Sequence, residues 1–320
     1  MGQKRNSEAA TAGSSPEDAC PVCFGRDWRL FANAFDRLLN RPGQVWQIRR
    51  CQGCGFGWTA PPLDVEEIAG HYPNTYHGDT SRTIEEFLSG RLQKSRSWRQ
   101  ELEKVELVER DVQSGRILDV GCGDGKFLWA LDRGRWERFG VEFSQGTVDL
   151  VRGRIQDLNL MAGDIFEERL GEGTFDVVTF WHVLEHLPFP ERVLERTRDL
   201  LKPEGRVFIS SPNLDSLQAR LFGRFWYAFD DVPRHLHHFT PRALEILLER
   251  AGFRVDGHLF FSKIINFHCL KHSLVNWSED SWNSRLPYYL LKPLLFVFPP
   301  AEYLSGRYGI MTSVGRKERG

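Results

Sequence analysis

The sequence predicts an α/β fold, a doubly wound parallel sheet that follows a small metal-binding module. From residue 116 onward, short apolar strands alternate with helix-length amphipathic segments. This alternation favours parallel pairing with right-handed crossovers. Near the start of the chain, four of the six cysteines form two C-x-x-C pairs, "CPVC" and "CQGC". Because a doubly wound sheet binds its ligands at the carboxyl ends of its strands, functional residues are expected there.

The composition is that of a globular protein and limits its partners. The 320 residues are 41% hydrophobic, enough for one large domain and a small one, and the formal net charge is −1. A charge near zero argues against a protein whose main partner is a phosphate backbone, so nucleic acid is not the expected partner. No apolar targeting segment stands near the start, which predicts a cytoplasmic protein with reduced thiols.

Changes in composition divide the chain into four segments. Residues 1–19 are small, polar and aperiodic, which predicts a disordered tail. Residues 20–62 are rich in Cys, Gly, Arg and aromatic residues, and we expect a zinc ribbon. Residues 63–112 carry apolar residues at helical spacing and form a predicted helical lead-in. Residues 113–320 contain the alternating strands and helices of the predicted α/β domain.

The two C-x-x-C pairs have the spacing of a zinc site. Cys20, Cys23, Cys51 and Cys54 form the pattern C-x2-C-x27-C-x2-C. Four thiolates suit tetrahedral Zn²⁺, and a reducing compartment favours metal binding over disulfides. The zinc is expected to be structural, because so short a segment cannot bury a sufficient core of its own.

A glycine-rich turn after the first strand of the α/β segment predicts a cofactor site. The stretch 117–125 reads "ILDVGCGDG", so a buried strand ends in an acid and a tight turn opens a helix. Its G-x-G-x-G pattern differs from the G-x-G-x-x-G of nicotinamide enzymes. Its two carboxylates suit a zwitterionic amino-acid tail beside a sulfonium better than a pyrophosphate. The candidate cofactor contacts in this turn are Asp119, Gly121, Cys122, Gly123 and Gly125.

Acidic residues end the next two predicted strands. Glu142 ends the second strand, 23 residues after Asp119, where an acid accepts hydrogen bonds from ribose hydroxyls. Asp164 ends the third strand, where a carboxylate suits the adenine amino group. Three neighbours at strand ends complete the expected cofactor contacts: Phe143, Ile165 and Trp181.

Together these motifs resemble the class I S-adenosylmethionine-dependent methyltransferases, above all the bacterial small-molecule branch with an N-terminal zinc ribbon. The resemblance also rests on "FDVVTFWHVLEHL" (175–187) and "LKPEGRVFISSPN" (201–213). It implies a Rossmann-like sheet of seven strands whose last strand, here "GIMTSVGRK" (309–317), is antiparallel. It further implies that Asp119, Gly121 and Gly123 hold the methionine portion of the donor. Glu142 would then hold the ribose, and Asp164 with Ile165 the adenine.

Two histidine-rich segments are candidates for the catalytic region. In "HVLEH", His182, Glu185 and His186 would share one face of a helix. In the loop 231–238, an arginine and three histidines suit a polar or anionic acceptor. The candidate general bases for an oxygen acceptor are His182, His186, His235 and His237. The alternatives are that Glu185 and His186 only brace their loop, and that the second loop is solvated.

The resemblance bears on metal binding at "HVLEH" as well. Some similar O-methyltransferases hold a divalent metal there with acids and a histidine. This chain has His182 in place of the first of those acids, so the sequence does not predict that metal.

The longest apolar stretch lies near the C-terminus, from Arg285 to Leu304. Lys292 and several prolines interrupt it, which makes it a poor membrane span. We expect it to be inserted between the last two strands as a cap or as a homodimer face. The alternative is peripheral membrane contact through residues 286–304.

The sequence therefore predicts an enzyme that transfers a methyl group from S-adenosylmethionine to a small-molecule acceptor. The expected acceptor is a saccharide, a lipid-linked intermediate or a natural-product intermediate. One alternative is an RNA or protein methyltransferase that docks its substrate on the ribbon, where arginines outnumber acids. The other is a regulatory protein that binds the cofactor without catalysis.

Overall fold

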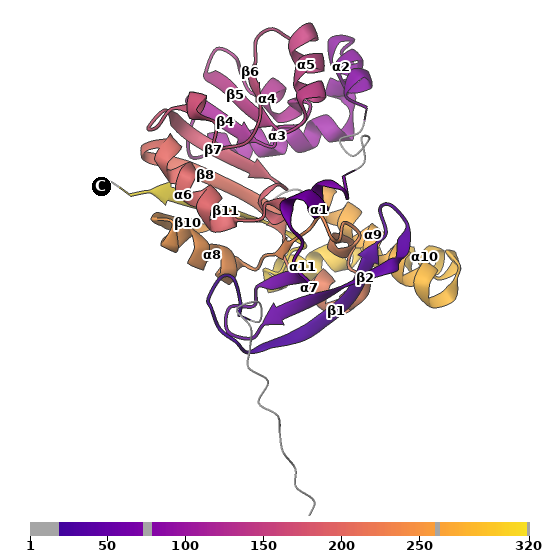
Figure 1. Ribbon diagram of the computed structural model, residues 1–320. Helices are drawn as coiled ribbons and strands as arrows, with labels where there is room; N and C mark the ends of the chain where they lie inside the picture. The colour runs from indigo at the N-terminus through magenta and orange to yellow at the C-terminus, as the bar shows by residue number, and fades with distance from the viewer. Residues whose placement is uncertain (1–18, 73–78, 260–262, 319–320) are drawn as a thin grey trace, which may run out of the picture.

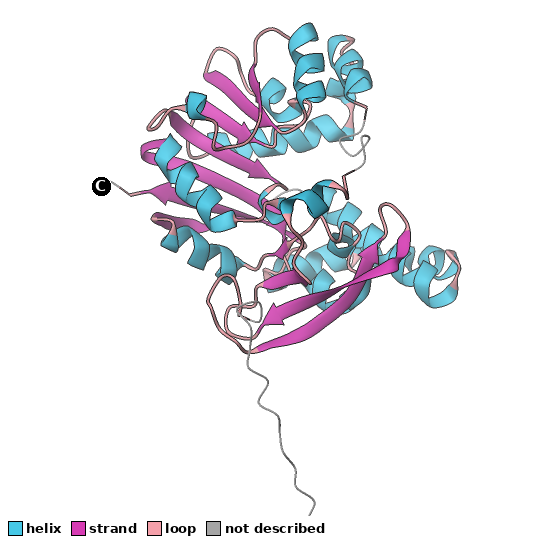
Figure 2. Ribbon diagram, viewed as in Figure 1, coloured by secondary structure: helices cyan, strands magenta, loops and turns pink. Residues whose placement is uncertain are grey.

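A computed structural model describes residues 19–72, 79–259 and 263–318. The predicted disordered tail lies outside these residues except for Ala19. The described chain forms two sheets, one of seven strands and one of four, with helices around them (Figure 1, Figure 2).

The seven-stranded sheet has the order β10-β11-β8-β7-β4-β5-β6. Strands β6, β5, β4, β7 and β8 pair in parallel, whereas β11 pairs antiparallel with both β8 and β10. This confirms the predicted doubly wound, Rossmann-like sheet with an antiparallel last strand. The strands are β4 Gly115–Val120, β5 Trp136–Glu142, β6 Asn159–Ala162, β7 Phe175–Trp181, β8 Leu201–Pro212, β10 Phe253–Leu259 and β11 Ile310–Lys317.

Helices cover both faces of this sheet. One face packs against a cluster built from α2, α3, α4 and α5, and the other against α6, α8 and the cysteine-rich segment. On β4, the buried Ile117 and Leu118 belong to these two clusters respectively, as expected for alternating side chains of a strand buried on both faces. The helices are α1 Val65–Ala69, α2 Thr80–Leu88, α3 Arg96–Glu109, α4 Lys126–Ala130, α5 Gln145–Arg154, α6 Pro190–Leu200, α7 Leu217–Phe222 and α8 Pro241–Arg250.

Helix ends follow the local sequence. The Thr240 side chain caps α8 by accepting a hydrogen bond from the Ala243 amide, and Pro241 occupies the first turn. Gly252 follows the helix at φ +84°, a conformation that favours glycine. The helix after the glycine-rich turn, α4, has only 5 residues and is shorter than the sequence pattern predicts.

The four-stranded sheet joins the cysteine-rich segment to the α/β part of the chain. Its order is β1-β2-β3-β9. Strands β1 Trp28–Asp36, β2 Arg41–Cys51 and β3 Gly57–Ala60 come from the N-terminal module, and β9 His237–His238 comes from the histidine-rich loop. The module therefore completes its sheet with residues from the predicted catalytic region.

The apolar C-terminal stretch lies between β10 and β11 in the chain, as predicted. It continues a helical layer formed by α9 Lys263–Trp282, α10 Leu286–Leu291, the 3-10 turn η7 Lys292–Phe296 and α11 Phe298–Ser305. A small separate cluster holds this layer together, with Leu270, Leu274, Tyr288 and Leu295 at its centre. Within the described residues, no helix has both the length and the apolarity needed to cross a bilayer.

Candidate functional site

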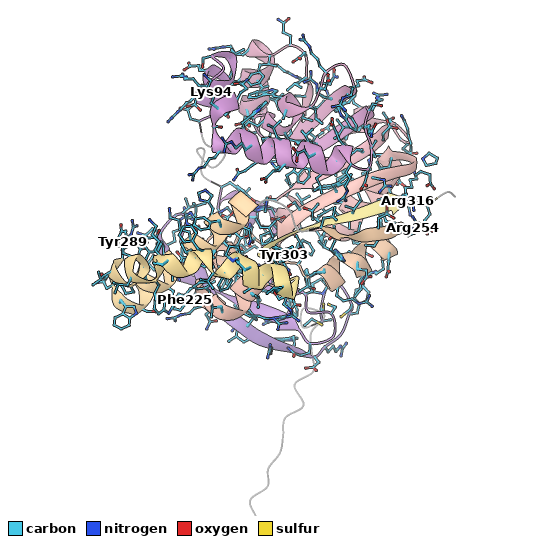
Figure 3. All side chains as sticks on the ribbon, turned by 180° about the vertical axis from the view of Figure 1, so that it is seen from behind. Lys94, Phe225, Arg254, Tyr289, Tyr303 and Arg316 are labelled. Atoms are coloured by element: carbon cyan, nitrogen blue, oxygen red, sulfur yellow. The ribbon has the colours of Figure 1, made fainter. Side chains whose placement is uncertain are left out.

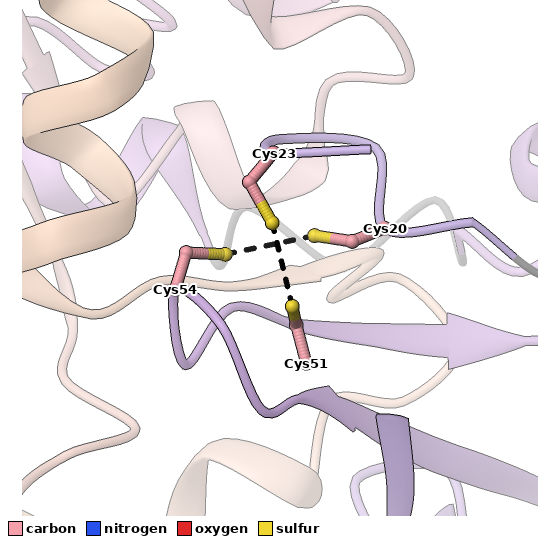
Figure 4. A group of neighbouring side chains, drawn as sticks. All are labelled: Cys20, Cys23, Cys51 and Cys54. Carbon is pink, nitrogen blue, oxygen red and sulfur yellow. Dashed lines mark hydrogen bonds between the residues drawn. The ribbon is translucent and has the colours of Figure 1, made fainter. Parts of the chain in front are cut away.

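The four predicted zinc ligands lie together in the N-terminal module (Figure 4). The Sγ atoms of Cys20 and Cys54 are 3.6 Å apart, and those of Cys23 and Cys51 are 3.4 Å apart. All four sulfur atoms lie within 4.8 Å of one another. Thiolates about 2.3 Å from a tetrahedral zinc ion are separated by about 3.8 Å. The spacing and the donor type therefore fit a structural zinc ion.

The thiols of this cluster differ in acidity. The pKa of Cys20 is lowered to about 5, chiefly because the Cys54 thiol donates a hydrogen bond to its thiolate. The same contact and burial raise the pKa of Cys54, and burial raises that of Cys51. The Cys20 thiolate thus lies beside the neutral Cys54 thiol, and a bound cation would stabilise deprotonation of Cys54.

The glycine-rich turn has open space at Gly123 and is tightly packed at Gly121. Gly121 has φ +67° and Gly123 has φ +53°, so both adopt the left-handed conformation. A Cβ atom on Gly121 would lie 2.6 Å from the Val183 side chain, whereas one on Gly123 would meet no heavy atom within 4 Å. The backbone at Gly123 is therefore accessible to a ligand, and that at Gly121 packs against "HVLEH".

Asp119 ends β4 beside this turn and is buried. Its Oδ1 atom accepts a hydrogen bond of 2.6 Å from the hydroxyl of Thr179, which lies opposite on β7. Burial raises the pKa of Asp119 to about 7, although this hydrogen bond opposes the shift. Sequence reasoning missed Thr179, which the alignment of β4 with β7 could have identified.

Glu142, at the end of β5, anchors the turn from the neighbouring strand. Its carboxylate accepts hydrogen bonds from the Gly123 amide at 3.0 Å and the Ser144 amide at 2.9 Å. Phe143 follows it with 85% of its surface exposed, so its ring is accessible to a flat ligand. The carboxylate thus lies at the open part of the turn, beside an uncovered aromatic ring.

The third acid, Asp164, follows β6 and is exposed. Its Oδ1 atom accepts a hydrogen bond of 2.8 Å from the Phe166 amide, and the adjacent Ile165 is buried. Since β4, β5 and β6 are parallel neighbours, their three terminal acids lie along one edge of the sheet.

Trp181 ends β7 and is covered by residues that the sequence analysis did not single out. The Phe127 ring lies 5.3 Å from its ring, and the Lys104 ammonium lies 5.5 Å from its ring centre. Lys104 also forms an ion pair of 2.8 Å with Glu101 on α3. The helical lead-in therefore forms one wall of the predicted cofactor region.

The "HVLEH" segment is not an α-helix. A 3-10 turn covers Leu184–His186, and His182 precedes it in a left-handed conformation with φ +59°. The His182 amide donates a hydrogen bond to the Ser210 carbonyl at 2.9 Å. His182 Nδ1 nevertheless lies 3.4 Å from Glu185 Oε1, so the two side chains meet at the end of β7.

Glu185 and two histidines form a second group of possible metal ligands. Ligand atoms of Glu185, His186 and His235 lie within 4.8 Å of one another. Burial alone would raise the pKa of Glu185, but His182 and the other two histidines lower it overall. Burial lowers the pKa of His186 to about 4, with a further contribution from His235. One carboxylate and two imidazoles suit a transition metal better than magnesium.

The histidine-rich loop is buried, so its interpretation as a solvated loop is wrong. His237 Nε2 lies 3.0 Å from the Leu187 carbonyl oxygen, and His235 Nδ1 lies 2.7 Å from that of Ala228. Burial lowers the pKa of His237 to about 4 and that of His238 well below its usual value. The loop packs between the cysteine module and residues 182–187.

Of the four candidate bases, His182, His186 and His235 lie around Glu185, whereas His237 lies apart from them. The rings of His186 and His235 are 4.6 Å apart, and both contact the Glu185 region that His182 also reaches. The His237 ring instead packs on Phe56 of the module, 5.6 Å away. Sequence reasoning also missed Tyr72, whose hydroxyl lies 3.1 Å from His186 Nδ1.

Comparisons with known proteins identify a family that this chain matches. A model of a methyltransferase domain family matches residues 90–258. A ubiquinone biosynthesis O-methyltransferase of Nitrosococcus oceani is 33% identical over 153 residues, which cover 44% of this chain and 64% of that protein. One of Neisseria meningitidis serogroup C is 30% identical over 177 residues, covering 51% and 72% respectively.

A solved structure shares the fold. It is a chain from the complex between the Haloferax volcanii Trm112 methyltransferase activator and a putative methyltransferase. It superposes with a TM-score of 0.51 and 18% identity, covering 71% of this chain and 92% of that chain. The family match spans the glycine-rich turn, the strand-end acids and the "HVLEH" segment. The chain therefore belongs to this methyltransferase domain family and is an S-adenosylmethionine-dependent methyltransferase.

Proposed function

We propose that this enzyme methylates an oxygen atom of a small molecule, with His182 as the general base. One observation carries the proposal. Val183 packs against Gly121 in the predicted cofactor turn, and this contact supports a position of the His182–Glu185 pair beside the proposed donor site. A base beside the donor turn can reach a hydroxyl that approaches the methyl group.

His182 is better suited to proton transfer than the other three histidines. Its side chain is 33% exposed, whereas His235 and His237 are buried with ring nitrogens directed at backbone carbonyl oxygens. His186 has a pKa lowered to about 4, chiefly by burial, which makes it a weak base near neutral pH.

The proposed step needs only proton transfer and alignment from the protein. When bound, S-adenosylmethionine supplies an activated methyl group whose carbon–sulfur bond breaks as the new carbon–oxygen bond forms. Glu185 next to Nδ1 favours the His182 tautomer that carries its proton there. His182 Nε2 then accepts the acceptor's hydroxyl proton, and Asp119, Glu142 and the turn hold the donor.

Two observations favour a small acceptor over RNA. The named relatives are O-methyltransferases of ubiquinone biosynthesis, which supports an oxygen acceptor here as well. Two ribbon arginines are also engaged within the chain. Arg37 pairs with Asp280 at 2.6 Å, and Arg50 pairs with Asp215 at 3.0 Å.

A panel of acceptors tests the proposal. Purified enzyme with labelled S-adenosylmethionine would be offered catechol, a long-chain alkylcatechol, a nucleotide sugar and total RNA. We expect label in a small-molecule arm and none in RNA. His182→Ala should slow that transfer by about 10²- to 10⁴-fold, whereas His272→Ala, at an exposed histidine of α9, should not. Labelled RNA with no labelled small molecule would overturn the proposal.

We also propose that the helical layer after β10 contacts a lipid surface in the cytoplasm. Within residues 286–304, several large apolar or aromatic side chains are exposed and form what we call the apolar surface: Leu286, Tyr289, Leu290, Phe296, Val297, Tyr303 and Leu304. Figure 3 shows Tyr289 at the projecting end of the layer, with Tyr303 farther along it. A bilayer interface suits such a mixture of aliphatic and tyrosine side chains.

The charges around the apolar surface favour anionic lipid. Among the described residues of 286–304, Glu302 is the one acid, and it is buried and hydrogen-bonded to Gln218. Lys292 is exposed beside the apolar side chains, and so is Arg285, which also pairs with Glu279. Basic residues near an apolar surface attract a negatively charged leaflet.

Vesicle sedimentation tests this contact. The protein should sediment with phosphatidylglycerol vesicles more than with phosphatidylcholine vesicles, and Leu290→Glu with Phe296→Glu should abolish the difference. Leu88→Glu, an exposed leucine on α2, is the matched control. If the double variant instead dissociates a dimer in ultracentrifugation without changing vesicle binding, the surface is a homodimer face.

A further inference from the structure

The cysteine module contacts residues 234–238 of the histidine-rich loop. Trp58 pairs with His237, and Gly57 pairs with His238, in the β3–β9 ladder. The Thr59 amide donates to the Leu236 carbonyl at 3.0 Å. The Thr59 hydroxyl donates to the His235 carbonyl at 2.7 Å and lies 3.2 Å from His238 Nε2. The loop backbone is thus held by a strand of the module.

A buried ion pair forms a second link between the module and the loop. Arg234 donates to both carboxylate oxygens of Asp36, at 2.8 and 2.9 Å, and both side chains are fully buried. Asp36 ends β1, while Arg234 precedes the histidines. Two parallel charge-assisted hydrogen bonds fix the direction of the guanidinium as well as its position.

The far side of the same loop contacts the proposed catalytic segment. The Leu236 amide donates to the Glu185 carbonyl at 3.0 Å. His186 Nδ1 lies 3.1 Å from the Arg234 carbonyl oxygen, and His237 Nε2 lies 3.0 Å from that of Leu187. A shift of the loop would therefore move residues 185–187, which adjoin His182.

The metal-binding end of the module is also fixed to the α/β core. The Thr240 hydroxyl donates to the Cys54 carbonyl at 3.1 Å, and Arg250 donates to the Val22 carbonyl at 2.6 Å. Cys51 and Cys54 share one hydrophobic cluster with Phe239 and Leu247. The two C-x-x-C turns, the histidine-rich loop and α8 are thus packed against one another.

We propose that Asp36 and Thr59 of the cysteine module are positioning residues for methyl transfer. They act through the loop on residues 185–187, and so on the His182–Glu185 pair. The module accordingly serves the acceptor side of the reaction and leaves the donor side unaffected. This proposal rests on the proposed role of His182, but its first readout does not depend on turnover.

Ring nitrogen signals in NMR of protein with labelled histidine provide that readout. Thr59→Val keeps the side-chain shape and removes the hydroxyl bonds to the loop. We expect the His186 and His235 ring signals to move, while calorimetric binding of S-adenosylhomocysteine stays unchanged. Thr59→Ser, which retains the hydroxyl, should restore the signals. Asp27→Asn, an exposed aspartate of the same module, is the matched control.

A second variant addresses the buried ion pair. Asp36→Asn alone leaves the buried Arg234 paired with Asp231 but without its bidentate partner, and can destabilise the protein. The double variant Asp36→Asn with Arg234→Gln removes both charges and keeps neutral hydrogen-bonding groups. It should fold, bind S-adenosylhomocysteine normally and still show displaced His186 and His235 signals. If wild-type enzyme methylates one of the panel acceptors, the double variant should show a kcat about 10- to 100-fold below that of wild type. Its KM for S-adenosylmethionine should be unchanged.

The outcomes separate the two proposals. If the ring signals stay in place in both Thr59→Val and the double variant, or move equally in Asp27→Asn, the positioning role is wrong. If wild-type enzyme methylates no panel acceptor while the signals move as described, only the proposed acceptor class fails.

Discussion

The Thr179 hydroxyl donates a hydrogen bond to the Asp119 carboxylate across the β4–β7 pair, and the two oxygen atoms lie 2.6 Å apart. This hydrogen bond favours the ionised form of a carboxyl group whose burial favours the neutral form. The balance leaves the pKa of Asp119 at about 7. The charge of the predicted donor site therefore changes near neutral pH.

The first prediction follows from this pKa. In the proposed donor site, the ionised Asp119 carboxylate attracts the ammonium group of the donor's methionine portion more strongly than the neutral carboxyl does. The affinity for S-adenosylhomocysteine should therefore rise as the pH increases through about 7. Calorimetry across that range should show the rise in wild type and its absence in Asp119→Asn. Asp119→Ala should weaken binding by about 1–3 kcal/mol.

Thr179→Val should shift the same pH dependence upward, because the hydrogen bond that stabilises the carboxylate is lost. Thr197→Val is a suitable control, since Thr197 is also buried but its hydroxyl donates within α6 to the Val193 carbonyl. A pH dependence that is the same in Thr179→Val and wild type would show that another group is titrating.

Zinc content should depend on the N-terminal cysteines. We expect elemental analysis to find about one zinc ion per chain, the number that a single four-thiolate site holds. Cys51→Ser should lower it and destabilise the module, whereas Cys269→Ser, a buried cysteine outside the cluster, should leave it unchanged. Retention of zinc after all four ligands are replaced would assign it to Glu185, His186 and His235.

His237 should make the protein sensitive to acid. Its folded pKa is about 4, against about 6.5 in an unfolded chain. The ring is neutral in both states at higher pH. Between about pH 6.5 and 4, the unfolded state binds a proton that the folded state does not, so stability falls. The loss from this residue is at most about 3 kcal/mol.

Urea denaturation at several pH values measures this effect. His237→Gln should reduce the fall in the free energy of unfolding over that pH range, although its stability at neutral pH will also be lower. His268, a half-buried histidine of α9, provides the comparison through His268→Gln. Equal acid sensitivity in wild type and His237→Gln would show that other groups dominate.

The His182→Ala variant should separate catalysis from cofactor binding. Loss of a positioned general base typically slows a reaction by about 10²- to 10⁴-fold. Calorimetric affinity for S-adenosylhomocysteine should stay unchanged, because His182 faces the acceptor side in the proposed arrangement. A matching loss of cofactor affinity would place His182 in the donor site and argue against its role as the base.

Local patterns predicted the sheet and the places of the strand-end acids. Alternating apolar strands and helices identify β4, β5 and β6, and Asp119, Glu142 and Asp164 stand at or directly after their ends. Each acid lies within two residues of the end of its own strand, so each signal is local in the sequence. The sequence also predicted the four cysteines of the metal-binding cluster, because the C-x-x-C spacing brings the two thiols of each pair together within one turn.

Contacts between distant segments could not be read in this way. The Asp36–Arg234 pair joins residues 198 positions apart. A strand of two residues, such as β9, is too short to show alternation. The helical interpretation of "HVLEH" failed because His182 adopts a left-handed backbone, which the sequence does not signal. Packing against the module, and not hydropathy, decides the burial of His235 and His237.

The β3–β9 pairing also determines when the N-terminal module can finish folding. Thr59 and His238, which meet in this sheet, are 179 residues apart. During synthesis the cysteines emerge early, but the fourth strand of their sheet follows only after most of the α/β part has been made. Non-local pairings of this kind form slowly, because a long loop must close first. The module therefore completes its fold together with the domain it supports, and not ahead of it.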